Sequence, residues 1–96
     1  MYEQAIQLVT YYEKQKEIAN RLRVLRKKRK ISRERLSQIS GVSYATIRRF
    51  EETGDISFES FVKIALSLRR YEELDALFKD KTKYTSIEEV LKDQED

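Results

Sequence analysis

The chain has 96 residues, of which 40% are hydrophobic and 39% are charged; its net charge is +3, and it contains neither cysteine nor histidine. This length supports one small hydrophobic core, the missing residue types exclude disulfides and thiolate metal sites, and no stretch reaches the ~20 apolar residues that span a bilayer. We therefore expect a cytoplasmic protein without catalytic activity, cofactor, metal, membrane contact or evident small-molecule effector.

Residues 2–29 are expected to form one long helix, or two helices with a bend near Gln15, because apolar residues recur at steps of three or four. The members of this stripe are Leu8, Tyr11, Ile18, Leu22 and Leu25. Four further apolar residues, Ala5, Ile6, Val9 and Tyr12, make the N-terminal extension (residues 1–17) apolar over a wide arc. Two alternatives follow: the extension packs on its own domain, or it pairs with another chain.

Basic residues are concentrated in the first half of the chain. Residues 1–50 have a net charge of +9, whereas residues 51–96 have a net charge of −6. Between Arg21 and Arg35 there are nine Lys and Arg residues and one acid, Glu34. A surface of this kind suits a polyanion such as nucleic acid; the alternative is a solvated helix face rich in Lys and Arg.

Two short helices are expected next, over residues 33–39 and 44–52, with Ser32 and Ser43 as their N-caps. Gly41 lies between them, where a chain leaving a helix often needs a positive φ. Helices this short are unstable unless tertiary contacts hold them, so the pair indicates a rigid unit. Its predicted core residues are Leu36, Val42, Ile47 and Phe50.

The remaining segments also read as helices, which makes the predicted fold class all-α. Residues 53–55 are expected to form a loop, and Ser57 is expected to cap the next helix. The predicted buried residues of this helix and of a last one over residues 71–78 are Phe58, Phe61, Ile64, Ala65, Leu68, Leu74, Leu77 and Phe78. Residues 80–96 are predicted to be a charged connector and a short C-terminal helix at 86–92.

The spacing of Leu36, Ser37, Gly41, Val42, Ile47 and Phe50 is typical of a helix-turn-helix, whose second helix enters the major groove of DNA. The stretch "LRVLRKKRKISRERLSQISGVSYATIRRFE", followed by "ISFESFVKIALSL", resembles the Cro/repressor (XRE-like) family. The residues that carry the resemblance are Leu22, Leu25, Arg26, Ile31, Leu36, Gly41, Val42, Ser43, Ile47, Glu51, Ile64, Ala65 and Leu68.

The resemblance implies a five-helix DNA-binding domain over residues 18–79, with Gly41 as its corner. It also implies a charge pair between Arg26 and Glu51; the alternative is two surface charges of little energetic value. The chain departs from the family at three places. Lys30 and Arg33 stand where Gly and Gln are usual, and the glycine after the second helix of the motif is shifted by one position, to Gly54.

By the same resemblance, the base-reading positions are Tyr44, Ala45, Arg48 and Arg49. Arg49 is the strongest candidate because a guanidinium can bridge O6 and N7 of guanine; alternatively, it contacts phosphate or pairs with an acid such as Glu52. Ala45 suits a thymine methyl group or is a filler that lets the helix sit deep in the groove. Tyr44 is expected to stack on sugar or donate to phosphate, with packing at the rim as the alternative. Arg48 could instead pair with Glu52. The predicted phosphate contacts are Arg33, Ser43, Thr46 and Thr53.

The family likeness predicts a sequence-specific DNA-binding regulator, in particular a homodimeric repressor on a palindromic operator. The segment "KYTSIEEVL" also resembles the C-terminal ends of small antitoxins of the HipB type, which would imply a toxin partner. The rival hypothesis is a protein-interaction module that binds a toxin or an RNA polymerase subunit through the same helices. Arg33, Arg48 and Arg49 flank the expected docking surface and favour DNA as the partner, because a helix that binds a protein would be expected to expose apolar residues there.

Overall fold

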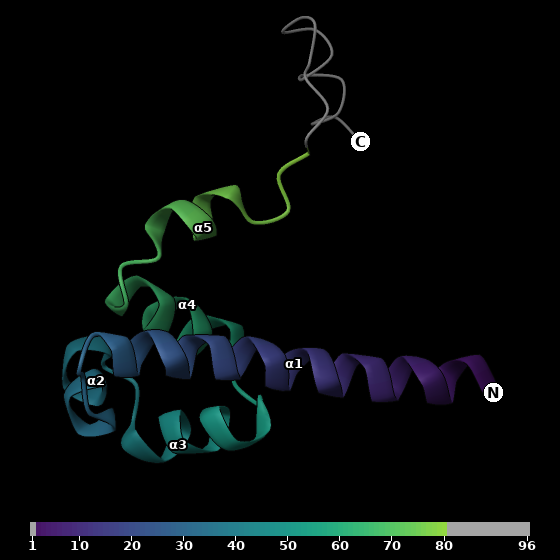
Figure 1. Ribbon diagram of the computed structural model, residues 1–96, viewed down its shortest axis with the longest axis horizontal. Helices are drawn as coiled ribbons and strands as arrows, with labels where there is room; N and C mark the ends of the chain where they lie inside the picture. Colours follow the sequence, from purple (N-terminus) through teal and green to yellow (C-terminus); the bar gives the residue numbers. More distant parts are fainter. Residues whose placement is uncertain (1, 81–96) are drawn as a thin grey trace, which may run out of the picture.

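The computed structural model describes residues 2–80, with side chains from residue 10 onward. Within this range the chain forms five helices and no strand (Figure 1): α1 (Tyr2–Lys28), α2 (Arg33–Ser40), α3 (Tyr44–Thr53), α4 (Phe58–Ser67) and α5 (Tyr71–Ala76). The all-α, five-helix prediction is confirmed. The predicted helix at 86–92 lies outside the described residues.

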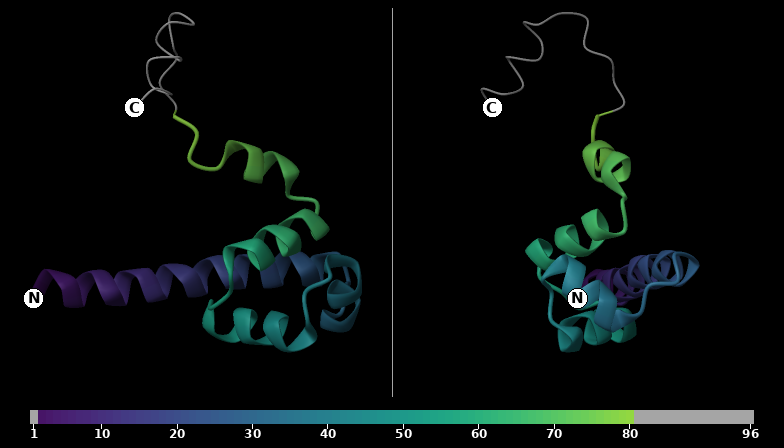
Figure 2. Two further views of the ribbon diagram at one scale, coloured as in Figure 1. Left: turned by 180° about the vertical axis from the view of Figure 1, so that it is seen from behind. Right: turned by 90° about the vertical axis from the view of Figure 1, so that its left-hand side faces the viewer.

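The N-terminal segment is one continuous helix rather than two. α1 has 27 residues, which corresponds to a length of about 40 Å. Its C-terminal half lies against the other helices, whereas its N-terminal part runs out beyond them (Figure 1 and the left-hand view of Figure 2). The other helices therefore pack around the C-terminal half of α1, where Ala19, Leu22 and Arg26 are buried.

Helix ends lie where the sequence predicts them, to within a residue or two. The hydroxyls of Ser32, Ser43 and Ser57 each accept a hydrogen bond from the backbone N–H three residues later, which satisfies a donor that a helix start leaves free. Gly41 ends α2 with a φ of 75°. Lys30, in place of the usual glycine, adopts a φ of 57°, a left-handed conformation that costs a non-glycine residue about 1 kcal/mol.

The hydrophobic core joins α1 to the helix-turn-helix and to α4. Its buried members are Ala19, Leu22, Leu36, Val42, Ile47, Phe50, Ile64 and Leu68, with Leu25, Ile31, Ile56 and Phe61 packed at its edge. All of these except Ala19 and Ile56 were predicted as core or family-pattern residues. Ala19 is fully buried because a small residue lets α1 approach its neighbours closely.

The structure contradicts the prediction for four residues: three that were predicted to be buried are exposed, and one that was predicted to lie in a loop is helical. Phe58 is 72% exposed because it begins α4 at its outer end, where it stacks on Phe61 instead of entering the core. Leu77 and Phe78 follow the end of α5 at Ala76, so Leu77 is partly exposed and Phe78 is 95% exposed, and both lie at the mouth of an apolar groove beside α1. Thr53 is the last residue of α3 and not part of a loop.

Candidate nucleic-acid interface

α3 presents one face to the core and the opposite face to solvent. Ile47 and Phe50 are buried, and they lie three residues apart on the inner side. The helical period places Ala45, Arg48 and Arg49 on the outer side, where all three are exposed. Three of the four predicted base-reading residues therefore share one outward surface, and Tyr44, also exposed, flanks it at the start of the helix.

The corner between α2 and α3 holds this surface rigidly. The N–H of Gly41 donates to the carbonyl of Ser37 at 3.0 Å, and the N–H of Val42 donates to the Ser40 hydroxyl at 3.1 Å. Val42 is buried next to the start of α3. Because these contacts fix both the backbone and the apolar side of the corner, α3 is held in one orientation.

A buried ionic cluster connects α1, α2 and α3. Glu51 accepts hydrogen bonds from Nε and Nη2 of Arg26, at 2.7 and 3.0 Å, and from Nε of Arg33, at 2.8 Å. Nη1 of Arg26 donates to the carbonyl of Ile31 at 2.8 Å. The side chains of Arg26 and Glu51 are only 8% and 3% exposed, so the expected charge pair is confirmed and is not a surface pair.

The ionic cluster shifts the pKa values of two of its members, Glu51 and Arg33. Burial raises the pKa of Glu51, but the hydrogen bonds from Arg26 and Arg33 outweigh it, and the net pKa lies below its ordinary value of 4.5. The hydrogen bond to Glu51 raises the pKa of Arg33, although partial burial opposes this, and nearby Tyr44 raises it further. Both groups are therefore fully charged at neutral pH.

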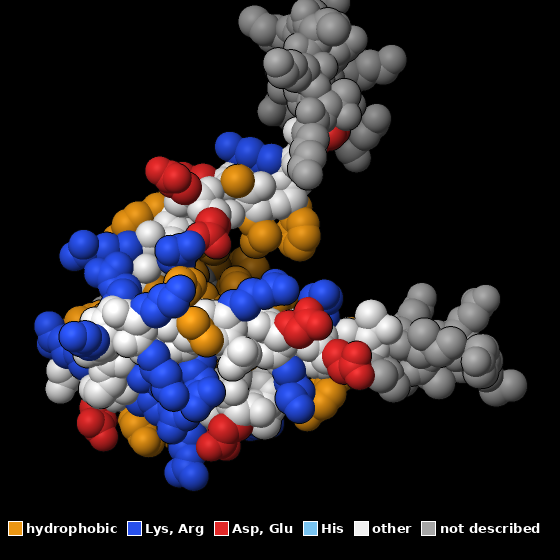
Figure 3. Space-filling model, in the orientation of Figure 1, with side chains coloured by type: hydrophobic (Ala, Val, Ile, Leu, Met, Phe, Trp, Pro, Cys, Tyr) orange, Lys and Arg blue, Asp and Glu red, His pale blue; other side chains and the backbone are white. Residues whose placement is uncertain are grey.

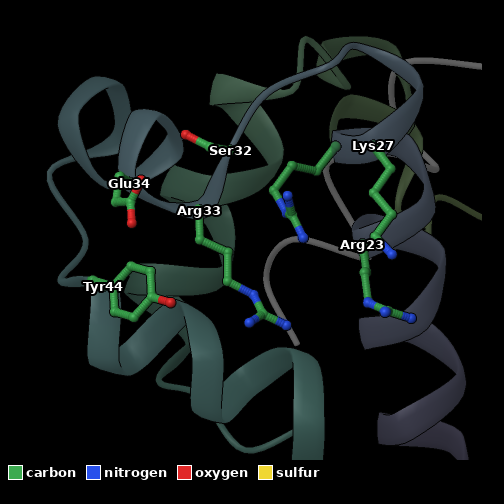
Figure 4. A pocket seen from close by; sticks show the side chains of 7 residues that line it. Arg23, Lys27, Ser32, Arg33, Glu34 and Tyr44 are labelled. Carbon is green, nitrogen blue, oxygen red and sulfur yellow. The ribbon is translucent and has the colours of Figure 1, made fainter.

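Beside this cluster lies a surface cleft of about 380 Å³, which we call the basic cleft. Its lining residues are Arg23, Arg26, Lys27, Ser32, Arg33, Glu34 and Tyr44. Figure 4 shows Arg23 and Lys27 on α1 facing Arg33 and Tyr44 across the cleft. Four cations and one carboxylate around one opening make a surface that attracts an anionic group such as a DNA phosphate.

Lys and Arg side chains gather on the face of the molecule that carries α3 and the adjoining end of α1 (Figure 3). Two of the predicted base-reading residues on α3 make exposed ion pairs. Nη2 of Arg49 lies 2.8 Å from Oδ2 of Asp55, and Nε of Arg48 lies 3.2 Å from Oε1 of Glu52. Such exposed pairs are worth about 0–1 kcal/mol, so a stronger contact can replace them.

The residues predicted to contact phosphate lie at three places: the start of α3, the end of α3 and the basic cleft. Ser43 donates through its hydroxyl to Oγ1 of Thr46 at 2.8 Å, at the start of α3. Thr53 donates to the carbonyl of Arg49 at 2.7 Å and accepts from the N–H of Asp55 at 3.1 Å, so its hydroxyl stabilises the end of α3. Arg33 lies in the basic cleft with Nε held by Glu51. Phosphate binding by these residues stays a prediction.

Two residues of the basic cleft, Arg23 and Lys27, were not singled out from the sequence, although they belong to the basic run after Arg21. Arg23 and Lys27 are four residues apart, so the sequence could have shown that both lie on the same face of the helix. The sequence analysis also did not identify Asp55 as the partner of Arg49, because the pair forms across the turn at Gly54.

Among the described residues, no group of carboxylates could hold a metal ion, and no helix is long and apolar enough to cross a membrane.

Comparison with known proteins agrees with this geometry. A helix-turn-helix family model matches residues 22–73, which is more than half of the chain and includes α2, α3 and α4. No curated protein and no solved structure matches the chain. The buried ionic cluster, the glycine corner and the exposed face of α3 all lie within the matched segment. We conclude that the chain belongs to the Cro/C1-type (XRE) helix-turn-helix family of DNA-binding transcription regulators.

Proposed function

We propose that the protein is a homodimeric repressor that binds a palindromic operator, with α3 in the major groove and the basic cleft on the DNA backbone. The observation that carries this proposal is the position of the basic cleft beside the exposed face of α3. A phosphate in the cleft would fix the register of the helix, and Ala45, Arg48 and Arg49 would face base edges. The role is non-catalytic and cytoplasmic.

The rival role, a module that binds a toxin or polymerase subunit through α3, is less favoured. A helix that binds a protein groove typically presents a row of apolar anchors three or four residues apart, whereas the outer face of α3 consists of Ala45, two arginines and Glu52, with Tyr44 at its edge. An antitoxin role rests on the resemblance of residues 83–91, which lie outside the described residues, and it stays a prediction.

Fluorescence anisotropy with a labelled duplex from the region upstream of the protein's own gene tests the proposed function. We expect tight binding at low salt, and log affinity that falls against log salt with a slope of about 0.9 per neutralised phosphate. A scrambled duplex of the same length is the control and should bind more weakly. If the two duplexes bind alike at every salt concentration, sequence-specific regulation is refuted.

Arg49→Ala is expected to lower discrimination between the operator and a scrambled duplex by about 1–3 kcal/mol, because it removes a bidentate base contact. Arg33→Ala should instead weaken both duplexes equally and reduce the salt slope by about 1, because it removes a phosphate contact. Lys63→Ala on α4, which removes an exposed cation paired with Glu59, is the control and should change neither. Equal loss of discrimination in the two arginine variants would contradict the assigned roles.

A further inference from the structure

Asp55 places a negative charge beside the surface that is expected to meet DNA. It follows Gly54 in the turn after α3, and its side chain is 61% exposed. A carboxylate in this position repels phosphate and lowers the affinity for every DNA sequence alike. A residue that only completed the turn would serve DNA binding better without this charge.

Asp55 contacts Arg49, the strongest candidate for a base-reading residue. Oδ2 of Asp55 lies 2.8 Å from Nη2 of Arg49, whose side chain is 71% exposed. The pair borders a surface hollow of about 360 Å³, which leaves space beside the guanidinium; its other lining residues are Tyr11, Tyr12, Gln15 and Thr53. The contact uses one corner of a planar guanidinium that has further N–H donors, enough for a bidentate contact with guanine. Arg49 can therefore hold Asp55 and read guanine at the same time.

The backbone that carries Asp55 is fixed from two sides. Its N–H donates to Oγ1 of Thr53 at 3.1 Å, and the same hydroxyl donates to the carbonyl of Arg49 at 2.7 Å. On the other side, Gly54 lies so close to α1 that an added Cβ would be 2.7 Å from the backbone carbon of Gln15. The carboxylate of Asp55 is thus attached by a short side chain to a rigid turn.

The neighbouring pair of Arg48 and Glu52 is built differently. Nε of Arg48 lies 3.2 Å from Oε1 of Glu52, and both side chains project from the same exposed face of α3. A glutamate side chain has more rotatable bonds than an aspartate, so its carboxylate is held less firmly. Asp55, in contrast, reaches Arg49 from a separate segment of backbone. Asp55 therefore restricts Arg49 more than Glu52 restricts Arg48.

We propose that Asp55 is a positioning residue that determines specificity, because it holds the guanidinium of Arg49 in the orientation that reads guanine and away from the DNA phosphates. The proposal rests on the proposed function, since it assigns one base choice of the repressor to a pair of residues. Two effects of opposite sign follow. The carboxylate weakens binding to any sequence by repelling phosphate, and it strengthens the preference for guanine because Arg49 loses less rotamer freedom on binding.

Fluorescence anisotropy with Asp55→Asn tests both effects. Asparagine keeps the size of the side chain and removes its charge, and the pair is exposed, so the variant should keep the circular dichroism spectrum of wild type. We expect it to bind a scrambled duplex about 2- to 5-fold more tightly than wild type. The ratio of operator affinity to scrambled affinity should fall by about 3- to 10-fold, which is part of the loss expected for Arg49→Ala.

Glu52→Gln is the matched control, because it removes the same charge from the pair with Arg48. It should tighten binding to both duplexes alike and leave their affinity ratio unchanged. If Glu52→Gln lowers the ratio as much as Asp55→Asn does, the loss is a general effect of charge and the proposal is wrong.

Substitutions in the operator show whether the loss occurs at the base that Arg49 reads. Each G·C pair of one half-site is replaced in turn by A·T, and the replacement whose effect disappears in Arg49→Ala marks the guanine in question. Asp55→Asn should reduce the effect of that replacement and leave the effects of the others at their wild-type values. An equal reduction at every G·C pair would contradict a role through Arg49.

A double-mutant cycle completes the test. If Asp55 acts through Arg49, Asp55→Asn should cause no further fall in the affinity ratio once Arg49 is replaced by alanine. The same fold loss in the wild-type and Arg49→Ala backgrounds would overturn the proposal and leave the repressor function intact. If wild type itself binds the operator and the scrambled duplex alike, the proposed function fails, and the positioning role fails with it.

Discussion

Replacing Glu51 with glutamine is expected to lower the free energy of unfolding by about 3–5 kcal/mol, a large share of the stability of a domain this size. Among the described residues, Glu51 is the acid that pairs with Arg26, whose side chain is 8% exposed. With glutamine at position 51, one of the two acceptor oxygens is replaced by an amide NH₂ group, and the guanidinium, which also donates to the carbonyl of Ile31, is buried without a counter-charge. Urea denaturation followed by circular dichroism measures the loss.

Glu52→Gln is the matched control. Glu52 is the next residue of α3, but it is exposed and pairs with exposed Arg48. Its replacement should change the free energy of unfolding by less than about 1 kcal/mol. Comparable losses in the two variants would show that burial of the Arg26–Glu51 pair does not determine its strength.

The stabilising effect of Glu51 is also expected to depend on pH. The pKa of Glu51 in the folded protein lies below 4.5, so its charge stabilises the fold at neutral pH, and this stabilisation is lost as the pH falls from about 4.5 through the folded pKa. The difference in melting temperature between wild type and Glu51→Gln should therefore shrink from pH 7 to pH 3. A difference that stays constant would mean that the Glu51 carboxylate is not the group that titrates.

Gly54→Ala is expected to cost about 3 kcal/mol, because two unfavourable effects coincide there. Gly54 has a φ of 81°, and a Cβ at this residue would lie 2.7 Å from the backbone carbon of Gln15 and 2.9 Å from its carbonyl oxygen. The left-handed backbone alone costs an alanine about 1–2 kcal/mol, and α1 would have to move to relieve the contact. Chemical denaturation of the purified variant measures the loss.

Gly41→Ala separates the two effects. Gly41 has a similar φ, 75°, but no atom lies within 4 Å of a Cβ placed there. We therefore expect a loss of only about 1 kcal/mol, from the backbone conformation alone. If Gly41→Ala and Gly54→Ala lose the same stability, the close approach of α1 to the end of α3 is not energetically significant.

The sequence by itself determined the helices, their caps and the helix-turn-helix corner. Ser32, Ser43 and Ser57 act within three residues of chain, and Gly41 needs only its own φ, so local pattern was sufficient for each. The concentration of basic residues in the first half was equally readable, since charge does not depend on the fold. These local and additive properties gave the fold class and favoured DNA as the partner.

Only the tertiary structure decided how distant residues combine. The burial of Glu51 between Arg26 and Arg33, the approach of Gly54 to Gln15, and the cleft that Arg23 and Lys27 share with Tyr44 all join separate helices. The exposure of Phe58 and Phe78 depends on where α4 begins and α5 ends, which the apolar pattern alone did not indicate. Helical period tells which residues share a face, but only the packing of helices determines which face is covered, and by what.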